Sequence, residues 1–354
     1  MSSKNAVLTI DQLEPGMVLA KDVVADRVIL VSKGVVVTDA LIKQLREKFV
    51  LRDIEVISND SGKPERVKIN NEKDVKDIEQ SFEQFTGVVK NIFNNLDTEA
   101  MDGIKDVREF AKNIQKELHS TGSIIKSVVL YGSGSDSIYR HSVNVAALSS
   151  ILAGWLGFGE NKINLVTYSG ILHDYGKTII NQDILNKKEQ LTNEELKEIR
   201  NHPVIGYEKI KKIHFLDSSV FYGVLMHHER LDGSGYPLGF KEDKIHEFAR
   251  IIAIADVFDA VNSNRVYKKS KGPFEVLEII QKESLGKLDY EYSKVFLDHI
   301  VNYYIGENVK LSDGTIGKII QINPNDYSRP LLLCEDSFLD LKKQLDLNVV
   351  DLVL

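Results

Sequence analysis

Seven histidine and aspartate side chains stand where the apolar pattern of the sequence predicts buried helices. They are His141, His173, Asp174, His202, His227, His228 and Asp256. Imidazole nitrogens and carboxylate oxygens are ligands for divalent metals, and a set without thiolate suits Fe, Mn, Ni, Co or Zn. We therefore expect a metal centre, and among these ions we favour Fe or Mn.

Asp256 gives the strongest argument for a cation, because its neighbours in the chain are apolar. Residues 251–258 read IIAIADVF, and an unpaired carboxylate buried among such neighbours is heavily penalised. Asp174 stands in a similar position between the apolar residues 171–172 and 179–180. A divalent ion shared between the two aspartates would neutralise both carboxylates.

The number of ligands predicts two ions. Seven protein ligands exceed what one tetrahedral or octahedral ion takes while it keeps a position open to water. Asp174 has two carboxylate oxygens and can bridge two ions about 3.5–4 Å apart, the separation with which two-metal enzymes clamp a phosphoryl group.

Three basic residues follow the ligands closely enough to supply local positive charge. Lys177 comes three residues after Asp174, so on a helix it would face the same side. Arg265 and Lys268 follow Asp256 in the stretch VNSNRVYKK, and we expect them at the rim of the same pocket. The chain has a formal net charge of -7 and no evident basic patch, so we expect no DNA binding.

The periodicity of apolar residues predicts the elements that hold these side chains. From Lys73 to about Ile305 apolar residues recur at three and four spacing, which predicts a mainly α fold. Residues 8–60 alternate β-branched runs with turns around one helix that begins at Thr38 or Asp39, a pattern typical of a small α+β module. After residue 306 the runs VKLSDGTIGKII and RPLLLCED predict a small β-rich module.

Four parts follow from these patterns. We expect a small α+β regulatory module at 1–62, connecting helices at 63–125, a catalytic helical domain at 126–305 and a small β-rich module at 306–354. The polar, turn-forming stretch NDSGKP at residues 59–64 suits the first boundary.

Two further features bear on location. The single cysteine, Cys334, cannot form an internal disulfide, and the N-terminus lacks the apolar stretch of a secretory signal, so we expect a cytoplasmic protein. The longest nearly apolar run, residues 143–158, is too short to span a bilayer, so we expect no membrane insertion.

The ligand motifs together resemble the HD-GYP phosphodiesterases, a subgroup of the HD metallohydrolase superfamily that hydrolyses cyclic di-GMP. His173-Asp174 matches the HD pair, and Gly235-Tyr236-Pro237 matches the GYP element. The resemblance covers roughly residues 130–300 and includes the stretches HDYGK, NHPVIG, HHERLDGSGYP and ADVFDAVNSNRVYKK. It implies that the helical domain is an HD-type bundle.

The resemblance also implies roles for individual residues. It assigns one metal to His141, His173, Asp174 and Asp256, and a second metal to His202, His227, His228 and the bridging Asp174. The implied substrate contacts are Lys177, Tyr236, Arg265 and Lys268. Lys177 and Asp174 are the expected catalytic residues. Independently of the resemblance, Glu229 and Asp259 are candidates either for orienting ligand imidazoles or for solvated or capping roles. Ser137 stands where some relatives carry a glutamate for a third metal, which favours a two-metal site.

We expect a phosphodiesterase that hydrolyses cyclic di-GMP to pGpG through a hydroxide bridging two metal ions, with further hydrolysis to GMP left open. One alternative is another cyclic dinucleotide such as 3′,3′-cGAMP, because the sequence exposes no base-reading contacts. Another is a receptor that binds cyclic di-GMP without hydrolysis. A homodimer and a signalling protein that contacts the GYP loop are the partner hypotheses.

Overall fold

The computed structural model of the chain divides into two compact units. One unit comprises Asp74–Phe296, and the other combines Met1–Lys73 with Leu297–Leu354. The structure describes residues 4–21, 23–25, 28–31, 37, 39–48, 53–58, 63–64, 72–96, 107–109, 111–113, 121–133, 138–213, 216–263, 273–323, 326–335 and 337–353. The finer four-part division stays a prediction.

The first unit is helical, which confirms the prediction of a mainly α fold. Its helices are α2 (Glu72–Asn95), α4 (Thr121–Tyr131), α5 (Ile138–Trp155), α6 (Glu160–Leu172), η3 (Tyr175–Thr178), α7 (Gln182–Leu185), α8 (Asn193–Arg200), α9 (His202–Ile210), α10 (Ser218–Met226), η4 (Glu242–Lys244), α11 (Glu247–Asn262), α12 (Pro273–Glu283) and α13 (Tyr290–Ile300). None of the helices described is both long and apolar enough to cross a membrane.

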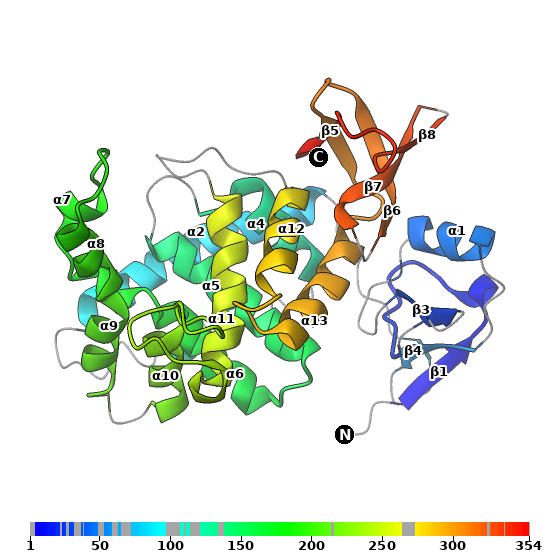
Figure 1. Ribbon diagram of the computed structural model, residues 1–354. Coiled ribbons are helices and arrows are strands. Elements are labelled where there is room, and N and C mark those ends of the chain that lie inside the picture. Colours follow the sequence, from blue (N-terminus) through cyan, green and yellow to red (C-terminus); the bar gives the residue numbers. More distant parts are fainter. Residues whose placement is uncertain are drawn as a thin grey trace. The chain divides into compact units, whose positions relative to one another are not determined.

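The core of this unit is formed by α5, α6, α10 and α11, which pack against one another (Figure 1). Helix α5 is buried from Arg140 to Ala153, because apart from Arg140, His141 and Asn144 its residues there are apolar or small on every face. Polar side chains mark where other helices begin: Thr192 and Glu195 form a capping box on α8, and His246 accepts the Phe248 N–H at the start of α11. The polar residues of the core helices are therefore exceptions that need partners.

The second unit contains two small sheets near the N-terminus. Strand β1 (Lys4–Leu8) pairs antiparallel with β4 (Ile54–Ser58), and β2 (Val23–Ala25) pairs with β3 (Val28–Val31). Helix α1 (Asp39–Lys48) adds Leu41 and Leu45 to an apolar cluster that includes the fully buried Val56. The predicted α+β character is confirmed, although β1 was not among the predicted strands.

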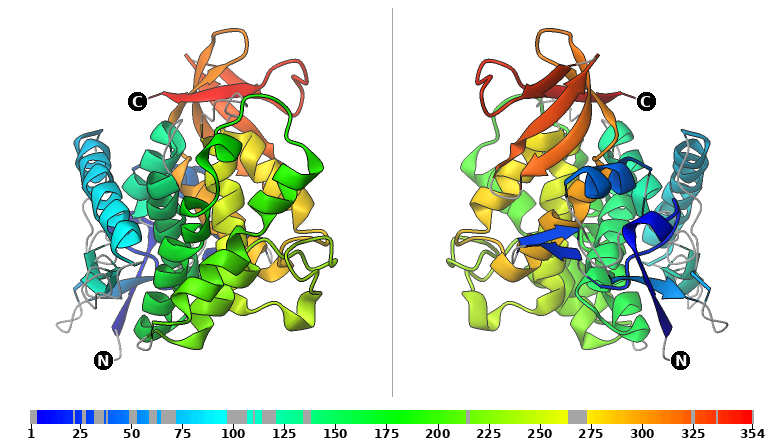
Figure 2. Two further views of the ribbon diagram at one scale, coloured as in Figure 1. Left: turned by 90° about the vertical axis from the view of Figure 1, so that its left-hand side faces the viewer. Right: turned by 90° about the vertical axis from the view of Figure 1, so that its right-hand side faces the viewer.

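The C-terminal part is a five-stranded antiparallel sheet in the order β8-β7-β6-β5-β9, drawn in orange and red in Figure 2. The strands are β5 (Asn308–Leu311), β6 (Ile316–Asn323), β7 (Asp326–Cys334), β8 (Ser337–Asp340) and β9 (Val349–Val353). The predicted turn joins β5 to β6: Gly314 has a φ of +91°, and Asp313 accepts the Thr315 N–H. The β-rich character is confirmed, and β8 and β9 extend it.

A close backbone approach brings η3 against the start of α9, and with it two of the predicted ligands. A methyl group on Gly176 would overlap the carbonyl oxygen of His202 and would lie 2.9 Å from the backbone nitrogen of Gly206. Only glycine permits this contact. Because Gly176 follows Asp174 by two residues, the contact sets the separation between Asp174 and His202.

We predict that Gly176→Ala lowers the free energy of unfolding by about 1–3 kcal/mol, the usual penalty of overpacking, when measured by urea denaturation. The matched control is Gly154→Ala on α5, where the glycine is exposed and a methyl group would meet no heavy atom within 4 Å. This control should be neutral or stabilising by up to about 1 kcal/mol, since alanine favours helix. Wild-type stability in Gly176→Ala would contradict the packing argument.

Candidate metal centre

The seven predicted ligands converge from six helical elements of the first unit. His141 lies on α5, His173 ends α6, Asp174 precedes η3, His202 begins α9, His227 ends α10 with His228 after it, and Asp256 lies on α11. They form two groups, in each of which the ligand atoms all lie within 4.8 Å of one another. The first group is His141, His173 and Asp256, and the second is Asp174, His202, His227 and His228.

The first group is organised around His141. Its Nε2 lies 3.0 Å from Asp256 Oδ1 and 3.2 Å from His173 Nε2. Its Nδ1 lies 2.6 Å from Asp259 Oδ2, so Asp259 orients this imidazole as expected from the sequence. His173 Nδ1 donates to the Gly170 carbonyl at 2.8 Å, which leaves the Nε2 lone pair of His173 directed at the group.

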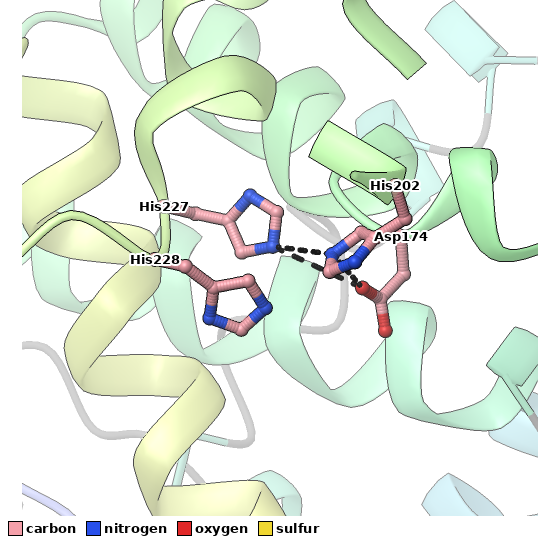
Figure 3. A group of neighbouring side chains, drawn as sticks. All are labelled: Asp174, His202, His227 and His228. Carbon is pink, nitrogen blue, oxygen red and sulfur yellow. Dashed lines mark hydrogen bonds and ion pairs between the residues drawn. The ribbon is translucent and has the colours of Figure 1, made fainter. Parts of the chain in front are cut away.

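The second group brings three hydrogen-bond acceptors together (Figure 3). His202 Nδ1 and His227 Nδ1 donate to the carbonyls of Ile199 and Val224, each at 2.7 Å. In the neutral rings both Nε2 atoms are then acceptors, yet they lie only 3.3 Å apart. His202 Nε2 also lies 3.2 Å from Asp174 Oδ1. Lone pairs held this close in a buried site are compatible with a cation between them.

Asp174 stands between the two groups and turns one carboxylate oxygen toward each. Oδ2 lies 3.6 Å from His141 Nε2 and 3.5 Å from His173 Nε2, whereas Oδ1 faces His202 and, at 3.9 Å, His227 Nε2. The carboxylate is buried, and no described donor hydrogen reaches Oδ1. The Asp174 carboxylate thus links the two groups of ligands.

Burial and neighbouring charges place most of these groups in the protonation states of metal ligands. Burial lowers the pKa of His173 to about 4, and it holds the pKa of His227 and of His228 well below the usual range. For Asp174 burial acts in the opposite direction, but Lys177, His173 and His202 together outweigh it and hold the pKa well below its usual range. His173, His227 and His228 are therefore neutral and the Asp174 carboxylate is ionised near pH 7.

His141 differs from the other imidazoles. Burial lowers its pKa, but the side-chain hydrogen bonds to Asp256 and Asp259 outweigh burial and raise the pKa to about 9. A proton on Nε2 is thus held against Asp256, and a cation that binds there has to displace this proton.

The GYP element packs directly against the second group. The ring of Tyr236 stacks on His228 with a centroid distance of 4.6 Å. A side chain on Gly235 would lie 2.5 Å from the His228 carbonyl oxygen, so glycine lets the loop approach this closely. Burial raises the pKa of Tyr236, and its hydroxyl stays a hydrogen-bond donor at neutral pH.

Glu229 holds this loop in place. The described contacts of its side chain are with backbone N–H groups and not with the imidazole that the sequence had suggested. Its carboxylate accepts the backbone N–H groups of Leu238 at 2.7 Å and Phe240 at 2.9 Å. The side chain is 3% exposed, so both hydrogen bonds are shielded from water.

The predicted substrate contacts have different outcomes. Lys177 lies at the centre, with Nζ 2.6 Å from Asp174 Oδ2, and Tyr236 lies against His228. Arg265 and Lys268 fall outside the described residues. Arg200, which the sequence analysis did not single out, places its guanidinium 5.4 Å from the centre of the Tyr236 ring; its position two residues before His202 was the available signal.

A cavity opens beside Tyr236. It has a volume of about 570 Å³, and its lining residues are Glu194, Lys197, Glu198, Arg200, Asn201, Tyr236 and Pro237. Helix α8 and the GYP loop therefore enclose a space next to the second ligand group.

These features define a helical protein with a histidine- and aspartate-rich centre compatible with divalent metal ions. Residues 129–291 match the family model described as HD domain. The matched segment contains all seven ligands and the GYP element. This segment of the chain is therefore similar to an HD domain.

Known proteins with similar sequences carry phosphodiesterase names. The chain is 33% identical over 195 residues to the cyclic di-GMP phosphodiesterase PA4108 of Pseudomonas aeruginosa, covering 55% of this chain and 47% of that protein. It is 35% identical over 190 residues to the 3′3′-cGAMP-specific phosphodiesterase 1 of Vibrio cholerae, covering 53% and 43%. The chain thus spans about half the length of the curated relatives that it matches.

One solved structure has a similar fold. It is Bd1817 of Bdellovibrio bacteriovorus, described as an HDG"Y"P protein, with a TM-score of 0.53 and 17% identity. The likeness covers 83% of this chain and 99% of the other, and it supports the fold alone.

We predict that Glu229→Ala releases the GYP loop, because the Leu238 and Phe240 amides lose their only buried acceptor in the described contacts. Amide hydrogen exchange at these two residues should accelerate by at least about tenfold, the equivalent of one buried hydrogen bond. The matched control is Glu208→Ala, which removes an exposed ion pair with Lys211 and should leave both rates unchanged. Slow exchange in Glu229→Ala would contradict the anchoring role.

Proposed function

We propose that this protein is a metal-dependent phosphodiesterase that hydrolyses cyclic di-GMP to linear pGpG. The observation that carries the proposal is the position of Asp174, whose two oxygens face two separate groups of imidazole acceptors. Two-metal centres of this kind serve phosphoryl transfer. The names of the relatives support a cyclic dinucleotide as the substrate class.

Under this proposal His141, His173 and Asp256 would hold one ion, and His202, His227 and His228 would hold a second. Asp174 would serve as a ligand of both groups. Fe or Mn are the proposed ions, with Ni, Co or Zn as alternatives that the same nitrogen and oxygen ligands accept. Divalent ions supply Lewis acidity and activate water at neutral pH.

The protein's own side chains prepare the site for an anionic substrate. Lys177 brings an ammonium group to Asp174 Oδ2, where it can stabilise charge on a phosphate oxygen. Tyr236 offers a neutral hydroxyl beside His228 and stands at the cavity lined by α8. Arg265 and Lys268 remain proposed phosphate contacts.

A second candidate substrate is 3′,3′-cGAMP. The observation in its favour is the similarity to a cGAMP-specific relative of Vibrio cholerae, at an identity comparable to that of the cyclic di-GMP relatives. A receptor that binds cyclic di-GMP without hydrolysis is disfavoured, because a purely binding role does not require a complete set of metal ligands. A cytoplasmic location, a homodimer and a signalling partner at the GYP loop stay predictions.

We predict that His227→Ala reduces hydrolysis of cyclic di-GMP by more than about 100-fold, because it removes a ligand and the electrostatic stabilisation that an ion supplies. Product chromatography on protein purified without oxygen and loaded with Fe or Mn measures turnover. Elemental analysis of the same samples should find two ions per wild-type chain and fewer in the variant. Circular dichroism should show that the helical fold remains.

The control is His246→Asn, which changes a histidine outside the two groups and keeps a residue able to cap α11. It should retain wild-type turnover and metal content. Full activity in His227→Ala would remove this residue from the mechanism. Tight binding of cyclic di-GMP by the metal-loaded wild type without product would establish the receptor instead.

A further inference from the structure

We propose that Glu79, on helix α2 outside the HD domain, positions the metal ligand His141 through a chain of buried side chains. Helix α2 thereby controls the geometry of the first ligand group. The inference rests on the metal-binding part of the proposed function, and it adds a residue from a segment that the family match, residues 129–291, does not include.

The series of hydrogen-bonded side chains from Glu79 to His141 begins with an ion pair between α2 and α5. Arg140 Nη1 and Nη2 donate to Glu79 Oε1 and Oε2 at 2.8 and 2.7 Å, a bidentate arrangement. Arg140 is 7% exposed, and its guanidinium also lies 5.0 Å from the centre of the Phe82 ring on α2. Ser127 of α4 donates to Glu79 Oε2 as well. The orientation of Arg140 is therefore set by α2.

The series of hydrogen bonds continues from Arg140 to His141 through two more side chains. Arg140 Nε donates to Asn144 Oδ1 at 2.9 Å, and Asn144 Nδ2 donates to Asp259 Oδ1 at 2.7 Å. The other oxygen of Asp259 lies 2.6 Å from His141 Nδ1. Because guanidinium only donates and carboxylate only accepts, the amide of Asn144 has a single consistent orientation.

The direction of these hydrogen bonds determines which ring nitrogen of His141 faces the first ligand group. Asp259 accepts the Nδ1 proton, so the Nε2 atom of the ring is directed toward Asp256 and His173. Partners of this kind fix the ring orientation and the basicity of metal-ligating histidines. A change at Glu79 therefore reaches Nε2 without any contact between Glu79 and the centre.

The spacing of residues along α5 and α11 explains why the hydrogen bonds from Glu79 to His141 form an unbroken series. Arg140 and Asn144 are one turn apart on α5, so both face the same side. Asp256 and Asp259 are likewise one turn apart on α11, and both reach His141, at Nε2 and at Nδ1. One helix thus supplies a ligand of the first group and the carboxylate that orients another.

The far end of α2 contacts the same ligand segments. Phe93 packs edge-on against Tyr139 with a centroid distance of 5.6 Å and against Tyr175 at 5.2 Å. Tyr139 precedes Arg140 and His141, and Tyr175 directly follows Asp174. Helix α2 is therefore tied at both ends to the chain segments that carry His141 and Asp174.

The place of α2 in the sequence makes it the segment through which the N-terminal part can act. The division between the two compact units falls between Lys73 and Asp74, within the first turn of α2. A displacement of α2 that separated Glu79 from Arg140 would leave a buried guanidinium without its carboxylate, which is strongly unfavourable. Arg140, Asn144 and Asp259 would then have to rearrange together, and His141 with them.

The test uses the full chain with Glu79→Gln, which keeps the shape of the side chain and removes its charge. Metal affinities are measured by competition with a chelator, using Mn²⁺ as the probe. We expect one of the two ions to bind at least about tenfold more weakly, the usual effect of removing a partner that orients a ligand, and the other ion to bind as in the wild type. In ¹⁵N-histidine-labelled protein, the Nδ1 proton resonance of His141 should shift.

The matched control is Glu83→Gln, one turn further along α2 at an exposed position, which should leave both affinities and the His141 resonance unchanged. Glu79→Asp retains the charge and should restore most of the lost affinity. If Glu79→Gln does not fold, Arg140→Lys carries the test with the same measurements, because lysine keeps the charge but cannot form the bidentate pair with Glu79. Unchanged affinities and an unmoved resonance together with lower thermal stability would overturn the inference and leave Glu79 a structural residue.

The outcome is distinguishable from failure of the proposed function. A wild-type chain that binds no Mn²⁺ would overturn both proposals. A wild-type chain that binds two ions, with a Glu79→Gln variant that binds them equally well, would overturn only the role of Glu79.

Discussion

The crowding of buried hydrogen-bond acceptors around Asp174 is the constraint on which the rest of this structure depends. Nε2 atoms of His202 and His227 approach each other and Asp174 Oδ1, while their Nδ1 protons are already donated to backbone carbonyls. Such an arrangement is stable only with positive charge at its centre. The other Asp174 oxygen has the Lys177 ammonium group beside it and the first imidazole group within reach.

The helical fold supplies the close contacts that this crowding requires. Gly176 allows α9 to touch η3, and Gly235 allows the GYP loop to lie on His228. Backbone carbonyls near the ends of α6, α8 and α10 accept the Nδ1 protons of His173, His202 and His227. Helix ends therefore provide both the histidine ligands and the backbone carbonyl acceptors that orient them.

Much of this centre could be predicted from the sequence, because ligand types and apolar surroundings are local properties. The clustering of all seven ligands and the orienting role of Asp259 are visible in the structure as expected. For Glu229 the interpretation as a residue that orients an imidazole was wrong, because its partners are backbone N–H groups of a loop that folds back on it. Glu79 was missed, since its partner Arg140 is 61 residues away and pairing at that separation has no local signal. Strands β1, β8 and β9 were missed for a similar reason, because short edge strands depend on their neighbours.

Anomalous diffraction from crystals of the Mn²⁺-loaded protein tests the central claim most directly. The account predicts two anomalous peaks per chain, one beside Asp174 Oδ1 within reach of His202 and His227, and one beside Oδ2 within reach of His141 and His173. A single peak, or two peaks that both lie away from Asp174, would contradict it.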